Sequence, residues 1–174
     1  TVDQTSSWNV TDVSYYLLDN VTVGVGSTLT VEPDVIVKLG LARRLTVNGA
    51  LRVLGTGADP VYFTSYRDDT IGGDTNGDGA STCSRGDWDW IEFTDTSDDT
   101  TSLIENAVIR YGGKDYSESQ GAIHLSEASP MIENTTFEDN DMCSLTADLR
   151  SFPTLTGNTY QDNDRNALCL KGGT

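Results

Sequence analysis

Short apolar runs separated by Gly, Pro and Asn dominate the pattern of this chain. Within each run, apolar or β-branched residues alternate with polar ones, and this period of two is typical of a β-strand. In the first third of the chain the runs cover residues 21–23, 29–31, 35–37, 45–47, 51–53 and 61–63. Later runs cover residues 90–93, 122–125, 144–146 and 167–170. No stretch keeps the three-and-four spacing of an amphipathic helix, so we expect little helix.

A repeat appears in the last third of the chain. The segment PMIENTTFEDND, residues 130–141, is echoed twenty-three positions later by PTLTGNTYQDND, residues 153–164. A period of roughly 20 to 50 residues is the mark of a solenoid, in which each repeat buries its apolar side only against its neighbours. The repeat places Asn140 over Asn163, which predicts an Asn ladder between successive turns.

These patterns together predict an all-β fold, a right-handed single-stranded parallel β-helix of about six coils with three short strands per coil. We expect one domain over residues 1–174, with residues 1–15 as an N-terminal cap and residues 66–88 as an acidic loop insertion. Two inward apolar ladders are predicted, one formed by Ile91, Ile123, Leu145 and Leu168, the other by Ile104, Ile132 and Leu155.

From about Tyr16 onward the chain resembles the right-handed parallel β-helix repeats of large secreted or cell-surface bacterial and archaeal proteins. The resemblance rests on the phrases STLTVEPDVIVKLG, LTVNGALRVLGTGADPVYFTS, DDTIGGDTNGDG, GDWDWIEF and IENAVIRYGG. It implies roles in adhesion, envelope structure or glycan contact. Some β-helix proteins are polysaccharide lyases or glycoside hydrolases, so fold alone does not exclude an enzyme.

The net charge of the chain argues against some classes of binding partner. Acidic residues outnumber basic ones by 27 to 11, which gives a formal net charge of −16. Nucleic acids and anionic membranes both require a basic surface, so the composition argues against both, and no apolar run is long enough to insert into a membrane. The absence of an initiator Met leads us to expect a processed protein or a segment of a longer one. The composition and the resemblance lead us to expect a location outside the cell or on its surface.

The acidic insertion contains the strongest chemical motif. Asp74, Asn76, Asp78 and the Ala80 carbonyl match the first half of a calcium loop, in which oxygen ligands at alternate positions face one ion. The second half departs from the motif, because Arg85 stands where a bidentate Glu is expected. A closing carboxylate would have to come from Asp68, Asp69 or Asp87. We therefore predict Ca²⁺ as the cofactor, with a simple polar turn as the alternative.

The three cysteines lack metal-ligand spacing. In an extracellular protein they allow one disulfide and one free thiol, for which Cys83 with Cys143 is one pairing; alternatively, they are small buried residues. Triplets that accept N-linked glycans begin at Asn9, Asn20 and Asn134.

No catalytic constellation emerges from the sequence. Asp139 over Asp162 and Asp141 over Asp164 stack at a spacing suited to a glycosidase, but their place in a repeated turn favours a structural role. His124 is expected to point outward between Glu92 and Thr146, as a surface contact and alternatively as part of an acid–base pair. Other candidates for sugar contact are charged or aromatic: Arg43, Arg44, Arg52, Trp8, Trp88 and Trp90.

The sequence therefore favours a structural or adhesive module without turnover, stabilised by calcium. The run at 167–170 begins a coil that nothing after it completes, and an open coil invites pairing. We expect either that further coils have been removed there, or that other copies of the chain or neighbouring β-helix domains stack there. The alternative is a domain that binds or degrades polysaccharide, with glycans as partners.

Overall fold

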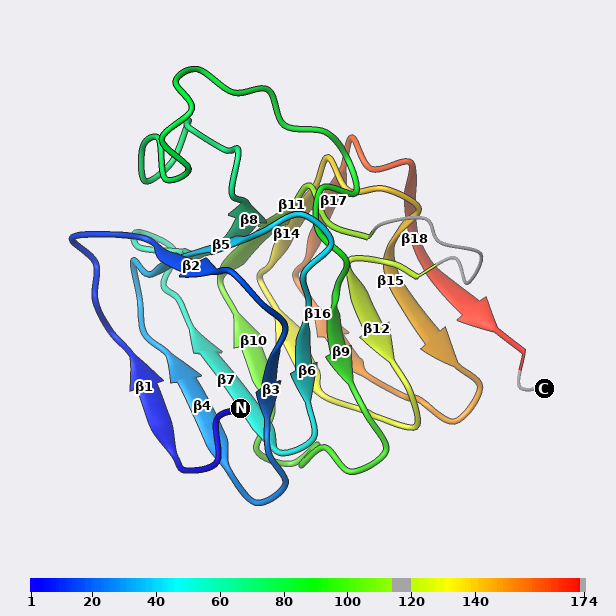
Figure 1. The fold of residues 1–174 in the computed structure, drawn as a ribbon. Helices are drawn as coiled ribbons and strands as arrows, with labels where there is room; N and C mark the ends of the chain where they lie inside the picture. The colour runs from blue at the N-terminus through cyan, green and yellow to red at the C-terminus, as the bar shows by residue number, and fades with distance from the viewer. Residues whose placement is uncertain (114–119, 173–174) are drawn as a thin grey trace.

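The computed structural model describes residues 1–113 and 120–172, and these residues form strands and turns but no helix. The strands belong to three parallel sheets of six strands each, and the chain visits the three sheets in rotation. Each circuit forms one coil, and the coils stack along one axis from the N-terminal to the C-terminal end (Figure 1). The predicted parallel β-helix with three strands per coil is confirmed.

The three sheets are named here by the order in which the chain enters them. Sheet 1 contains β1 (Ser6–Trp8), β4 (Thr28–Val31), β7 (Ala50–Leu54), β10 (Leu103–Glu105), β13 (Met131–Glu133) and β16 (Thr154–Thr156). Sheet 2 contains β2 (Tyr15–Leu17), β5 (Ile36–Leu39), β8 (Val61–Ser65), β11 (Ala107–Arg110), β14 (Thr136–Glu138) and β17 (Thr159–Gln161). Sheet 3 contains β3 (Val21–Val23), β6 (Leu45–Val47), β9 (Ile91–Phe93), β12 (Ile123–Leu125), β15 (Cys143–Asp148) and β18 (Arg165–Lys171).

Inward side chains stack in register along the axis and form the core. In sheet 3, Ile123 pairs with Ile91 on one side and with Leu145 on the other, and Leu145 pairs with Leu168. In sheet 1, Ile132 lies in the same way between Ile104 and Leu155. Both predicted ladders are confirmed. Burial of one such side chain contributes about 1.5 to 3 kcal/mol, so the stacked ladders are the main source of stability.

The turns between strands also stack closely. Gly49 follows β6, and a Cβ atom at this position would overlap the carbonyl oxygens of Gly24 and Ser27 in the preceding coil. Only glycine allows the two turns to approach this closely. The break that the sequence places at residues 48–49 is therefore required by coil stacking.

The N-terminal residues fold against the first coil. The predicted cap, residues 1–15, is partly a strand, because Ser6–Trp8 forms β1 and pairs with β4. Val2 forms a bridge with Val23, and the rings of Trp8 and Tyr15 stack with their centroids 5.1 Å apart. This segment therefore contributes the first strand of sheet 1 and a bridge beside sheet 3.

The Asn ladder is confirmed between the last two coils. The Asn140 side chain is fully buried, and its Nδ2 donates to Asn163 Oδ1 at 2.8 Å and to the Ile109 carbonyl at 2.8 Å. Its Oδ1 accepts the Gly112 N–H at 2.9 Å. Asn163 continues the ladder by donating to the Phe137 carbonyl and to the side chain of Asn166. The amides thus satisfy backbone groups where the coil turns and no strand is present to pair with them.

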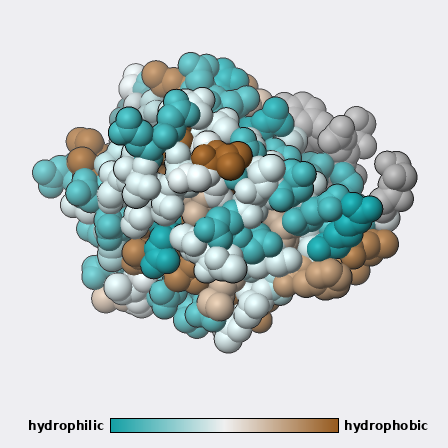
Figure 2. Space-filling view, turned by 90° about the horizontal axis from the view of Figure 1, so that it is seen from below, coloured by the Kyte–Doolittle hydropathy of each residue, from teal (hydrophilic) through white to brown (hydrophobic). Residues whose placement is uncertain are grey.

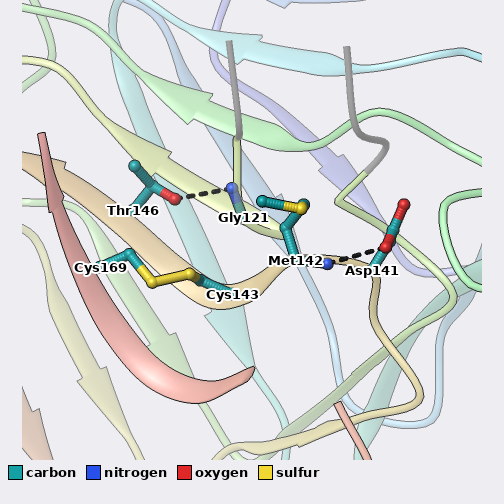
Figure 3. The surroundings of a disulfide bond; sticks show 6 residues. All are labelled: Gly121, Asp141, Met142, Cys143, Thr146 and Cys169. Carbon is teal, nitrogen blue, oxygen red and sulfur yellow. Dashed lines mark hydrogen bonds between the residues drawn. A yellow bond between two sulfur atoms is a disulfide. The ribbon is translucent and has the colours of Figure 1, made fainter. Parts of the chain in front are cut away.

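A disulfide joins the same two coils. It links Cys143 of β15 to Cys169 of β18, with Cα atoms 6.1 Å apart (Figure 3). The pairing of Cys83 with Cys143 is therefore wrong: β18 lies directly beside β15, whereas Cys83 lies in the insertion and is a free thiol. For a sequence separation of 26 residues, the loop-closure model gives about 3.5 kcal/mol of stabilisation.

Replacing Asn140 by Ala should reduce the free energy of unfolding by about 3 kcal/mol, because buried backbone groups at Ile109 and Gly112 lose their partners. Denaturant titration followed by circular dichroism measures this loss. Asn9→Ala is a suitable control, because Asn9 is exposed, and it should change stability by less than about 0.5 kcal/mol. Equal effects of the two substitutions would contradict a stabilising ladder.

Candidate functional site

The acidic insertion leaves sheet 2 after β8 and returns to sheet 3 at β9, and it forms the long green loop above β8 in Figure 1. Its first part folds back onto the outer face of sheet 2. Lys38, Thr64 and Arg110 project from neighbouring strands of that face and contact the insertion. The outer face of the β-helix therefore acts as a platform for this loop.

Asp68 is the centre of the contact between insertion and sheet. Its carboxylate is fully buried and accepts hydrogen bonds from Thr64 Oγ1 at 2.5 Å and from Arg110 Nε at 2.8 Å. Thr70 donates both its N–H and its hydroxyl to the same carboxylate. Burial alone would raise the pKa of Asp68, but these hydrogen bonds and the Arg110 charge outweigh it and hold the pKa below its ordinary value.

Lys38 fixes the backbone of the insertion. Its side chain is fully buried, and Nζ donates to the carbonyl oxygens of Asp68 at 2.8 Å and Gly73 at 2.5 Å. Burial lowers the pKa of Lys38, and the nearby carboxylates of Asp68 and Asp69 oppose that shift. Both ends of this stretch of the loop are therefore tied to one ammonium group on β5.

Arg110 connects the insertion to the next coil. It forms ion pairs with Asp68 at 2.6 Å and with Glu138 at 3.1 Å, and its guanidinium lies over the rings of Tyr62 and Tyr111. Burial would lower the pKa of Arg110, but the two carboxylates raise it overall, so the group stays charged. One cation thus holds three parts of the molecule together.

The second half of the insertion is attached through Asp87 and Arg85. Asp87 is buried and accepts hydrogen bonds from Ser65 Oγ at 2.8 Å and from the Ser84 N–H at 3.1 Å. Arg85, which occupies the position of the absent Glu ligand, forms an ion pair with Asp139 at 3.6 Å. Asp68 and Asp87 therefore already have donors from the protein.

The outer tip of the insertion holds the other predicted calcium ligands. Asp74 accepts the N–H groups of Gly77 at 2.7 Å and Gly79 at 3.0 Å, which bends the DTNGDG motif into a tight turn. Asp78 accepts the Ser81 hydroxyl, and Asp69 accepts the Ser81 N–H at 2.7 Å. Asp69 is thereby linked to the turn.

This arrangement brings Asp74, Asn76, Asp78, Ala80 and Asp69 into one loop, while Asp68 and Asp87 face the sheet. Among the residues that the structure describes, no three His, Cys, Asp or Glu side chains are grouped as a metal site. Any ion at the tip would therefore depend on amide and carbonyl oxygens in addition to carboxylates. Calcium binding remains a prediction.

The free thiol of Cys83 is poorly suited to nucleophilic chemistry. Burial, together with the carboxylates of Asp68 and Asp87, raises its pKa to about 12. A thiol is nucleophilic as the thiolate, and very little thiolate forms near neutral pH at such a pKa. Cys83 thus acts as part of the packing of the insertion.

The aspartates of the repeated turn are part of the backbone geometry of that turn. Asp139 and Asp162 both adopt the left-handed conformation, with φ of 51° and 52°, at equivalent points of successive coils.

His124 lies between Glu92 and Thr146 in register, as predicted, and its Nδ1 is 3.6 Å from Glu92 Oε1. The neighbouring His124 side chain is the main reason that the pKa of Glu92 is lowered.

The tryptophans do not form a platform for sugars. Trp88 is fully buried and donates from Nε1 to the Arg110 carbonyl at 2.9 Å, and Trp90 is 6 % exposed beneath the guanidinium of Arg44. Trp8 stacks on Tyr15 at the N-terminal end. These three candidates for sugar contact therefore share no common surface, because the indoles pack at different places in the molecule.

No protein-family model, curated protein or solved structure matches this chain. The resemblance to β-helix repeats is supported by the parallel β-solenoid itself. None of the described residues belongs to a helix that could cross a membrane.

Sequence reasoning missed Lys38 and Arg110 as the residues that anchor the insertion. A signal was present for Lys38, because it is a lysine in the middle of the run VIVKL in a chain that is rich in acid and poor in lysine. A charged residue at that position needs a buried partner or a covering loop. For Arg110 the strand AVIR gives no comparable signal.

The Asp68→Asn variant should lose about 3 kcal/mol of stability at neutral pH, because Arg110 loses a buried partner. The folded-state pKa of Asp68 lies below the unfolded value of about 3.9, so its contribution is fully present above that pH and is lost as the pH falls through the folded pKa. The difference between wild type and variant should therefore shrink under acidic conditions.

Thermal unfolding of both proteins between neutral and acidic pH measures this effect. Asp95→Asn, at an exposed position in another turn, provides the control and should show little difference at any pH. A constant gap between Asp68→Asn and wild type down to the lowest accessible pH would contradict the assigned role.

Proposed function

We propose that this chain is a structural or adhesive β-helix module of an extracellular or cell-surface protein. It associates with a second copy through its C-terminal coil end and is stabilised by calcium at the tip of the insertion. The exposed apolar surface of the last coil is the observation that carries this proposal.

Exposed apolar residues occur at both ends of the β-helix. Near the N-terminal end, Val13 and Leu18 are each 67 % exposed, while Val2 bridges to Val23 and Trp8 stacks on Tyr15. At the other end, β16, β17 and β18 are the last strands of their sheets, and Leu170 and Phe152 are 63 % and 75 % exposed. A parallel strand edge beside exposed apolar side chains is a surface that favours pairing with another chain.

The exposed apolar residues form one surface. Leu149, Phe152, Pro153, Leu168 and Leu170 line a cavity of about 360 Å³ beside Asp148 and Ser151. In the space-filling view, brown and tan residues gather at the end of the molecule that carries the last coil (Figure 2). Burial of three such side chains per copy against a second copy would supply several kcal/mol to association.

Two features of the last coils support a permanent, exposed structural role. The Asn ladder and the disulfide between Cys143 and Cys169 both fasten the final coil to the coil before it. Disulfides persist in oxidising surroundings, which supports a location outside the cell. A rigid end is also preorganised for association, because little conformational freedom is lost on binding.

Self-association should depend on protein concentration and on the apolar end. Leu170→Lys is expected to weaken association by about tenfold or more, because it places a charge on the surface to be buried. Sedimentation velocity over a wide concentration range measures the effect. Leu18→Lys is the matched control, since Leu18 is 67 % exposed and lies near the N-terminal end. A monomer at every concentration, or equal effects of both variants, would contradict the proposal.

Calcium should raise the melting temperature relative to a chelator. Binding at a hundred times the dissociation constant adds about 2.7 kcal/mol, which is a shift of several degrees for a domain of this size. Asp74→Asn should abolish the shift. Asp98→Asn should retain it, because Asp98 accepts N–H groups of Thr100 and Thr101 in a turn outside the insertion. Identical melts with calcium and chelator would rule out the metal.

A further inference from the structure

A groove crosses the outer face of sheet 1. Its floor is one row of outward side chains in register across four strands: Arg52, Leu103, Met131 and Thr154. Asp99 and Ser129 contribute to its walls, and its volume is about 280 Å³. The groove is separate from the insertion, which lies on sheet 2, and it reaches the apolar end of the last coil at β16, where Thr154 follows Pro153.

One wall of the groove is held rigidly. Asp98 accepts the backbone N–H groups of Thr100 and Thr101 at 3.1 Å and also both of their hydroxyls at 2.7 Å. The Ser102 N–H donates to the Asp98 carbonyl at 2.9 Å, which closes the turn. The neighbouring Asp99 is thereby fixed beside the floor, so the groove does not need to be ordered by a ligand.

Arg52 is the unusual residue of this groove. Its side chain is partly buried on the sheet, yet it forms no hydrogen bond, ion pair or ring contact with any residue that the structure describes. In the same chain the guanidiniums of Arg67, Arg110 and Arg150 all pair with carboxylates. With 27 acidic residues available, an unpaired and preplaced guanidinium is a ready partner for an external anion.

The rest of the lining sets the kind of anion. Leu103 and Met131 provide an apolar floor next to Arg52, and Asp99, Ser129 and Thr154 provide polar groups around it. A sugar ring has an apolar C–H face and hydroxyls at its rim, which matches this pattern. The volume is at the lower end of the range for small-molecule sites, so it suits one sugar unit.

We propose that the groove on sheet 1 binds a carboxylate-bearing sugar unit of a glycan. The Arg52 guanidinium pairs with the carboxylate, Asp99 accepts hydrogen bonds from ring hydroxyls, and the ring lies on Leu103 and Met131. The groove and the apolar end have different lining residues, although they meet at β16, and the variants below change only residues outside the apolar end.

The two methionines of the chain provide a direct test. Met131 is 41 % exposed in the groove, whereas Met142 is 9 % exposed near the disulfide. In protein labelled with ¹³C at the methionine methyl groups, titration with D-glucuronate should shift the Met131 signal saturably and leave the Met142 signal unchanged. Met131→Leu assigns the two signals. D-glucose and acetate, which each present half of the recognised chemistry, should bind more weakly.

Arg52→Gln should weaken glucuronate binding by about tenfold or more, the usual effect of losing a charge-assisted pair. Arg165→Gln, at an exposed position on β18, is the matched control and should bind as wild type does. Because Arg52 has no side-chain partner within residues 1–113 and 120–172, the variant should melt as wild type does. Absence of a saturable Met131 shift would overturn the proposal. So would an unchanged affinity in Arg52→Gln, or equal binding of acetate and glucuronate.

Discussion

The structure depends on in-register stacking of parallel coils. No coil can bury its inward side chains or pair its strand edges alone, so every coil requires the coil on each side. Ile123 between Ile91 and Leu145 is one example, since each side chain is shielded by the same position of the next turn. This constraint explains why inward positions repeat in chemical character, while outward positions differ from coil to coil.

Stacking also determines where the fold needs other support. Strand pairing ends where the chain turns, and there Asn140 and Asn163 satisfy carbonyl and amide groups with side-chain amides. The disulfide from Cys143 to Cys169 adds a covalent link between strands β15 and β18 of successive coils. The amide ladder and the cross-link therefore fasten the same two coils to each other.

The features that could be predicted from the sequence are those that recur from coil to coil because the coils stack. The strands, the two inward ladders and the outward position of His124 follow from a period of two within strands, and the Asn ladder follows from the interval of twenty-three between the last two coils. The attachment of the insertion was not predictable in the same way. It requires knowledge that Lys38 and Arg110 lie on outer positions of sheet 2 on either side of β8, and that both contact Asp68. These contacts join residues 30 and 42 positions apart, with no repeat to reveal them. The predicted disulfide pairing was wrong for a similar reason. Which two cysteines meet depends on the coil and strand that contain each of them, and the sequence alone does not show this.

In a β-helix, the coil ends and the outer faces of the sheets are different surfaces of the molecule. The proposed association at the coil end would extend the molecule along its axis and cover Leu168, Leu170 and their neighbours, while most of the outer faces of the sheets would stay open. Sheet 2 gives part of its outer face to the insertion, whose Asp68 carbonyl accepts a hydrogen bond from Lys38. Sheet 1 keeps an open groove in which Arg52 has no side-chain partner among the described residues. Because inward positions are constrained by stacking and outward positions are not, a structural module of this fold can carry a ligand site at little expense to its core.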